Sequence, residues 1–132
     1  MNPAPPPAPP APDEPTPEAE RRLAARLFNE VWRLLDRPDR SADDDTAMLH
    51  AAHASRHHWQ GAGGPREWAI GEWQISRVYA VLGRAEPAAH HARLCLGLAE
   101  RHALGAFLEA EAHEAAARAA MAAGDAQAFD RS

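Results

Sequence analysis

The sequence predicts an all-α protein, an antiparallel array of about five helices arranged as hairpins. Three observations lead to this expectation. Apolar side chains recur every three to four residues, which is the spacing of one face of an α-helix. Glycine, proline and capping residues divide the chain into segments of helical length. No segment alternates polar and apolar side chains as a half-buried strand does.

The N-terminal segment differs in composition from the rest of the chain. Nine of the 12 prolines lie within the first 17 residues, where the remaining side chains after Met1 are small or polar. A segment of this kind has too little apolar surface to form a packed core. We therefore expect residues 1–16 to be a disordered Pro/Ala-rich tail and residues 17–132 to be one helical domain.

The charge and composition exclude several classes of protein. The net charge is −5, and the 14 arginines, with no lysine, are scattered rather than clustered, which argues against direct nucleic-acid binding. No apolar run approaches the roughly 20 residues of a membrane span, and the start does not resemble a signal peptide. We expect a cytoplasmic protein without membrane contact, and its single cysteine fits a reducing compartment. The preference for arginine and alanine indicates a GC-rich bacterial genome.

The first helix has clear boundaries. Thr16 is placed to be its N-cap, with Pro17 at the first helical position, where a missing N–H costs nothing. The apolar stripe that follows continues to about Asp36. The helix is expected to stop there because Pro38 disfavours helical backbone in the residue before it.

The second and third helices follow with similar signals. Ser41 and Asp44 form a capping box for a second helix, which runs to the glycine-rich breaker at residues 61–64. Pro65 then opens a third helix. Most of its apolar side chains cover about half of its circumference, but Trp73 falls on the other half. A helix with apolar side chains on both sides is expected to lie between neighbouring helices.

A tight turn separates the third helix from the fourth. Gly83 is predicted to adopt the left-handed conformation that ends many helices, and Pro87 to occupy the first position of the fourth helix. The fourth helix should run to about Arg101.

The C-terminal part of the chain is expected to hold a fifth helix and the start of a sixth. The fifth is predicted over residues 106–123 and should end at Gly124, as the third helix ends at Gly83. A sixth helix would begin at Ala126 and be cut off at Ser132. Helical repeats usually need a polar capping helix. The edge without a cap therefore makes self-association a possible property of this chain.

The region from Trp68 to Leu96 resembles the tetratricopeptide repeat. The residues that carry the resemblance are Ile75, Ser76, Tyr79, Leu82, Gly83, Ala88 and Ala92. The likeness is weak over residues 106–128 and limited to topology over residues 17–61, and Gly83 and Gly124 are 41 residues apart rather than the typical 34 or so. The resemblance implies stacked helical hairpins that bind a protein or peptide, with no cofactor and no enzymatic activity.

The most distinctive polar pattern is a histidine stripe formed by His50, His53 and His57. These three side chains lie within about 60° of one another on a helix, and a spacing of four suits a divalent metal. The metalloprotease signature is not met, because Ala54 stands where that signature has glutamate. The favoured interpretation is a polar surface, with metal binding by the three histidines as the alternative.

Cys95 and His91 are a second pair of residues with catalytic potential. Cys95 and His91 lie one turn apart, as a nucleophile and its base can. No orienting carboxylate or oxyanion site accompanies them, so Cys95 is predicted to be a small core residue.

The sequence as a whole favours a non-enzymatic interaction module. A concave surface for a partner is expected from Trp73, Arg77, Glu72 and, if it faces inward, the stripe of His50, His53 and His57. One alternative is a histidine-rich metal-binding protein or metal-dependent enzyme. A second alternative, a regulatory domain that acts with a DNA-binding partner, rests on fold analogy alone.

Overall fold

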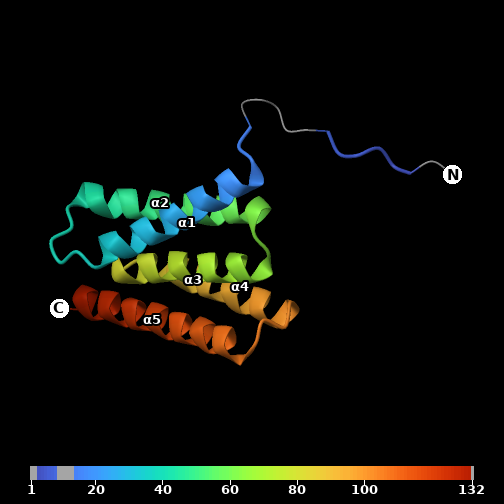
Figure 1. The fold of residues 1–132 in the computed structure, drawn as a ribbon. Coiled ribbons are helices and arrows are strands. Elements are labelled where there is room, and N and C mark those ends of the chain that lie inside the picture. Colours follow the sequence, from blue (N-terminus) through green and yellow to red (C-terminus); the bar gives the residue numbers. More distant parts are fainter. Residues whose placement is uncertain (1–2, 9–13, 132) are drawn as a thin grey trace.

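The computed structural model describes residues 3–8 and 14–131, which contain five α-helices and no strand (Figure 1). Side chains are described as far as Asp125. The helices are α1 (Pro17–Leu35), α2 (Ala42–Ala62), α3 (Pro65–Val81), α4 (Ala85–Arg101) and α5 (Ala106–Arg131). The expected all-α fold with about five helices is confirmed for these residues.

The helix starts follow the capping signals in the sequence. The Thr16 side chain accepts a hydrogen bond from the Ala19 N–H at 3.1 Å. Ser41 and Asp44 form the predicted capping box, with both hydrogen bonds at 3.1 Å. Each cap satisfies backbone N–H groups that have no partner inside the helix.

The turn between α3 and α4 closes as predicted at Gly83. Gly83 has φ +76°, and the Arg84 N–H donates to the Tyr79 carbonyl at 2.8 Å. The prediction that Pro87 opens α4 is wrong by two residues, because α4 begins at Ala85. Pro87 still lies in the first turn, where its missing N–H breaks no helical hydrogen bond.

The predicted end of the fifth helix at Gly124 is wrong. α5 continues through this glycine to Arg131, so no sixth helix begins at Ala126. Gly124 lacks the positive φ of Gly83, and no proline follows it to stop the helix. The last predicted residue of the sixth helix, Ser132, lies outside the described residues.

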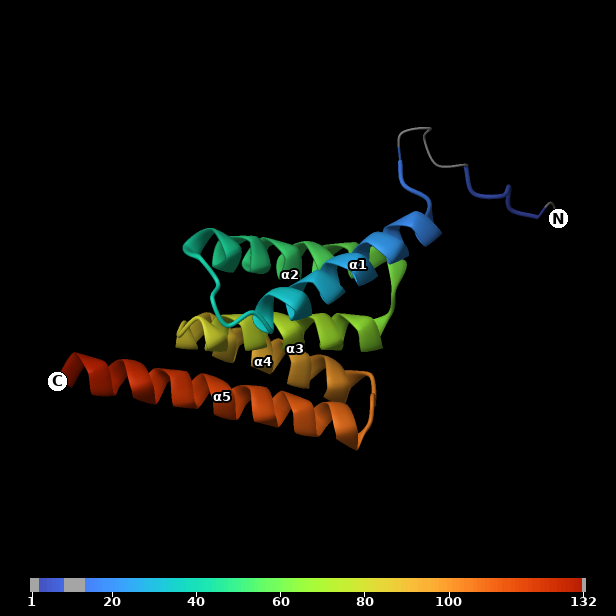
Figure 2. The same cartoon turned by 60° about the vertical axis from the view of Figure 1, so that its left-hand side comes forward.

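Helix α3 lies in the middle of the molecule. It packs against α2, α4 and α5, while α1 packs mainly against α2 (Figures 1 and 2). One buried cluster joins α1, α2 and α3: Val31, Leu34, Met48, Ala51, Ala52, Ile75 and Val78. A second joins α3, α4 and α5: Ala69, Cys95, Leu98, Ala99, Leu108 and Ala112. The expectation that this helix lies between neighbours is confirmed.

Buried polar side chains join the helices where small residues allow close approach. Ser76, on α3, donates to the Ala88 carbonyl of α4 at 2.7 Å, and Ser55, on α2, donates to the Ala24 carbonyl of α1 at 2.8 Å. The Gln74 amide reaches from α3 to a carbonyl of α1 at 2.9 Å. Each of these donors is buried and satisfied, so it fixes the position of one helix on the next without an unpaired polar group.

The N-terminal segment is described only in part. Residues 3–8 and 14–16 are exposed and lie outside the helices. The predicted disordered tail spans residues 1–16, of which residues 1–2 and 9–13 lie outside the described residues.

Candidate functional site

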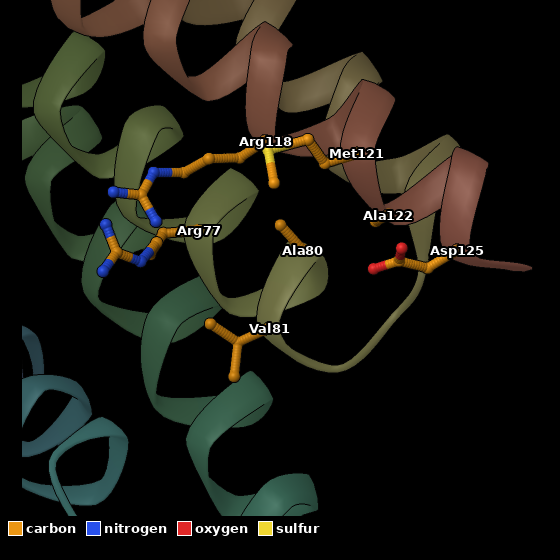
Figure 3. Close-up of a pocket in the computed structure, with 7 residues that line it drawn as sticks. All are labelled: Arg77, Ala80, Val81, Arg118, Met121, Ala122 and Asp125. Carbon is orange, nitrogen blue, oxygen red and sulfur yellow. The ribbon is translucent and has the colours of Figure 1, made fainter.

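A surface hollow lies between the C-terminal half of α3 and the later turns of α5. We call it the Arg77 hollow, and its volume is about 250 Å³. Its lining residues are Arg77, Ala80, Val81, Arg118, Met121, Ala122 and Asp125. Figure 3 shows the guanidinium groups of Arg77 and Arg118 side by side at one end, with the Asp125 carboxylate at the other end. The hollow therefore combines a basic end with apolar walls.

Arg77 lacks a protein partner within the described part of the chain. Its Nε atom is buried and forms no hydrogen bond there. Burial, followed by the neighbouring charge of Arg118, lowers the pKa of Arg77, while Glu114 and Glu111 act in the opposite direction. Arginine stays charged despite such a shift, because its usual pKa is above about 12. The side chain is thus a cation with unused hydrogen-bonding capacity.

Arg118, in contrast, is already paired. Its Nε and Nη2 atoms donate to the same carboxylate oxygen of Glu114, at 3.0 and 2.8 Å. This pairing holds the Arg118 guanidinium beside Arg77. Of the two arginines at the basic end, Arg77 is the one without a side-chain hydrogen bond among the described residues.

Trp73 lies one turn before Arg77 and packs inside the fold. Its ring centroid is 5.4 Å from that of Trp32 on α1, and it also packs against the buried cluster between α3, α4 and α5. The side chain is half-buried. Most of its apolar surface therefore serves the contact between helices, and it does not line the Arg77 hollow.

Glu72 is buried, with 6% of its surface exposed, so the expectation that it contributes to an open surface requires correction. Its Oε1 atom lies 3.6 Å from Nε of Arg56 on α2, and its Oε2 atom lies 3.4 Å from Nδ1 of His91 on α4. A carboxylate removed from water needs such partners, because an unpaired buried charge is strongly unfavourable. Glu72 is the centre of an internal contact among three helices.

His91 extends this contact into a larger group, which we call the His91 cluster: Arg56, Glu72, His91, Tyr79 and His53. The Tyr79 ring stacks on His91 with centroids 5.7 Å apart, and the Tyr79 hydroxyl lies 2.9 Å from Nε2 of His53. The His53 and His91 rings are 5.5 Å apart. The cluster joins α2, α3 and α4 through polar and aromatic contacts.

The histidine stripe does not act as one unit. All three side chains are exposed, but the His53 ring lies against His91 at 5.5 Å between ring centroids, and the His57 ring against His58 at 5.6 Å. Burial on one side, and next the proximity of His91, lower the pKa of His53. Among the residues with described positions, no three His, Cys, Asp or Glu side chains are placed to hold a metal ion.

Cys95 is fully buried. Burial raises the pKa of its thiol to about 11, with a further contribution from the charge of Glu72. The thiol therefore stays protonated near neutral pH and is shielded from solvent, as expected of a core residue.

Sequence reasoning missed most of the residues that share these sites. Arg118 and Met121 belong to the helix whose alanine richness concealed any distinct face, so nothing marked them as neighbours of Arg77. Arg56, His91 and Tyr79 lie on three helices, and only the packing of those helices brings them together. Gly71 was an available signal, because glycine inside a helix often marks a close approach.

The helices of the described region include none that is long and apolar enough to cross a membrane. No family model, curated protein or solved structure matches this chain.

Proposed function

We propose that the chain is a non-enzymatic, cytoplasmic interaction module that binds a segment of a protein partner in the Arg77 hollow. In this proposal the fold is a tetratricopeptide-like array of antiparallel hairpins. The first hairpin is α1 with α2, the second is α3 with α4, and α5 begins a third. The buried small residues Ser76, Ala88 and Ala92, at the contact between α3 and α4, support the resemblance.

The observation that carries the proposal is the unpaired guanidinium of Arg77. The Arg77 guanidinium lines the hollow and makes no hydrogen bond with the described part of the chain, so a ligand there can accept from its terminal nitrogens without breaking an existing contact. A carboxylate is the protein group that best matches a guanidinium. We therefore assign an acidic residue of the partner to Arg77.

The walls of the hollow suit the rest of such a segment. Val81 is 44% exposed and Met121 is 70% exposed, which leaves apolar surface beside the basic end. Apolar contact with a polar anchor at one end is the usual composition of a protein-binding site. Trp73 contributes indirectly, by holding α3 against α1.

Affinity capture from the native cell with the full chain as bait tests this proposal. Replacing Arg77 with methionine keeps most of the apolar stem and removes the charge, so capture of the specific partner should fall about 10- to 100-fold, as expected for a lost charged hydrogen bond. The matched control is Arg93→Met, at an exposed position of α4. It should capture the partner as the unchanged protein does.

Circular dichroism on the same samples shows whether both variants remain helical. Equal capture by Arg77→Met and Arg93→Met would refute the assignment of the hollow. The absence of any specifically captured protein would refute the interaction module itself.

A further inference from the structure

The outward face of α5 carries large apolar side chains that no described part of the chain covers. Phe107 is 72% exposed and Met121 is 70% exposed. The opposite face of the same helix packs into the domain through Leu108, Ala112, Ala115, Ala119 and Ala122, all buried. Figure 2 shows α5 at the edge of the molecule, with α3 and α4 on one side of it only.

The exposed residues form a continuous seam, which we call the α5 seam: Phe107, Ala110, Glu114, Ala117, Met121 and Gly124. Their spacing alternates between three and four residues, and they fall within about 100° of one another around the helix. This is the spacing of the contact face in paired helices. Because Glu114 is the one charged member, the seam is unusually apolar for a solvent-facing helix surface.

We propose that the α5 seam pairs with the same seam of a second copy of this chain, in antiparallel orientation. The two-fold axis passes between residues 115 and 116 of the two helices. Phe107 of each chain then faces Gly124 of the other, Met121 faces Ala110, and Glu114 faces Ala117. Each large side chain meets a small one, which is the complementarity that a two-fold interface between identical surfaces requires.

Gly124 provides an independent reason for this register. Glycine is unfavourable inside a helix, and a Cβ atom built at Gly124 would meet none of the described atoms of its own chain within 4 Å. The packing of one chain therefore does not explain this glycine. In the proposed pair, the space above it holds the exposed ring of Phe107 from the second copy.

The charges agree with the same arrangement. The two copies of Glu114 would lie about 4.5 Å apart along the helix axis near the centre of the interface, and the pairing of each with Arg118 of its own chain at 2.8 Å offsets their repulsion. The antiparallel register also brings Glu111 of one chain near Arg118 of the other, and this opposite-charge contact occurs twice by symmetry. A parallel pairing would instead place each charge opposite an identical charge.

The size of the seam sets the strength of the association. Its 17-residue separation between first and last members corresponds to about 26 Å of helix. One helix face of this length is smaller than the standard interface of about 800 Å² per partner. The pair should therefore exchange with free chains, with a dissociation constant of the order of micromolar. This contact shares Met121 with the partner site proposed above, whereas Phe107 and Ala117 do not line the Arg77 hollow.

Sedimentation velocity over a range of concentrations tests the self-association. The average mass should rise from one chain toward two chains as the concentration passes the micromolar range. Ala117→Glu places a second carboxylate in the centre of the seam of each chain and should weaken association by about 100-fold. Ala116→Glu, one residue away on an exposed position off the seam, should associate as the unchanged chain does.

Two results would overturn the proposal at this stage. One is a chain that keeps the mass of a monomer at all concentrations. The other is an equal effect of Ala117→Glu and Ala116→Glu, because net charge rather than the seam would then control association.

Cysteine cross-linking tests the orientation. Chains with Ala110→Cys mixed with chains with Met121→Cys should form mixed disulfides, since these positions face each other in the antiparallel register. Each variant alone should cross-link poorly. In a pair of identical variant chains, the two introduced cysteines lie about 16 Å apart along the helix axis, which is beyond the reach of a disulfide. Efficient cross-linking of each variant with itself would instead indicate a parallel pair and refute the register. Cys95 is buried and does not interfere.

Discussion

Arg56 crosses α3 at a glycine to reach the buried carboxylate of Glu72. A Cβ atom at position 71 would lie 2.8 Å from Cδ of Arg56 and 3.4 Å from its Cβ, closer than normal packing allows. Gly71 therefore permits the approach of α2 to α3 that positions the ion pair. At the residue scale, this contact is the most sensitive part of the His91 cluster.

Gly71→Ala should lower the free energy of unfolding by about 1–3 kcal/mol, the usual effect of overpacking a close contact. The matched control is Gly97→Ala on α4, where the nearest atom to a built Cβ is 3.7 Å away. That change should raise the free energy of unfolding by up to about 1 kcal/mol, since alanine favours helix more than glycine does. Urea unfolding of both variants gives the comparison. A stabilising Gly71→Ala would show that the helices do not approach each other in this way.

His53 makes the stability of the domain depend on pH. Its pKa is lowered from the usual 6.5, first by burial and then by His91, so the folded chain binds the proton less tightly than the unfolded chain. This difference does not change the free energy of unfolding at pH values well above the pKa of His53 in the unfolded chain. Stability is lost as the pH falls below about 6.5 and through the lowered pKa of the folded state.

His53→Gln should reduce the decrease in the free energy of unfolding between about pH 7 and pH 5, because glutamine does not take up a proton in this range. Urea unfolding at several pH values measures this slope, and His113→Gln, an exposed change on α5, is the control. NMR titration of the His53 ring should give a midpoint below 6.5, its usual value. A midpoint above that value would contradict the arrangement of His53 against Tyr79 and His91.

The sequence identified several of these residues but not their partners. The histidine stripe and Glu72 stood out by residue type, and both were assigned to a surface. The three histidines are exposed, whereas Glu72 is buried. Helical periodicity reports which side chains share a face of one helix, but not which neighbouring helix covers that face. The pairing of Glu72 with Arg56 and His91 depends on the packing of α2 and α4 on α3, which local patterns do not encode.

At the scale of the elements, the starts of the capped helices were predictable, the start of α4 was predicted two residues late, and the end of α5 was wrong. Starts depend on local chemistry: the Thr16 cap and the Ser41–Asp44 box are properties of a few adjacent residues. Gly124 and Gly83 look similar in the sequence, but only Gly83 has a positive φ. What differs is the sequence that follows, since the residues after Gly124 include two alanines and no proline.

The two glycines should respond in opposite ways to alanine. Gly124→Ala should raise the free energy of unfolding by up to about 1 kcal/mol, because α5 continues through this position and alanine favours helix. Gly83→Ala should lower it by about 1–2 kcal/mol, since alanine is strained at φ +76°. Urea unfolding at low protein concentration, where the proposed pair of chains is dissociated, measures both effects. A destabilising Gly124→Ala would mean that α5 ends where the sequence first suggested.

At the scale of the whole molecule, the fold class was accessible from the sequence and the candidate site was accessible only in part. Apolar periodicity and breakers account for the five helices, and the two-sided apolar pattern around Trp73 predicted the central position of α3. Arg77 was identified as a candidate binding residue because most other positions of its segment were assigned to packing between helices. Its neighbours Arg118 and Met121 lie about 40 residues further along the chain, and only the packing of α5 on α3 places them beside it.

The most direct test of the account is to map where the captured partner binds. An isotope-labelled sample of the full chain would be titrated with that partner and followed by NMR. We expect the largest chemical-shift changes at the Arg77 side-chain N–H and at the backbone amides of Val81 and Ala122, with little change at His53 or His91. Changes centred on His53 and His91, with the Arg77 signal unmoved, would contradict the account.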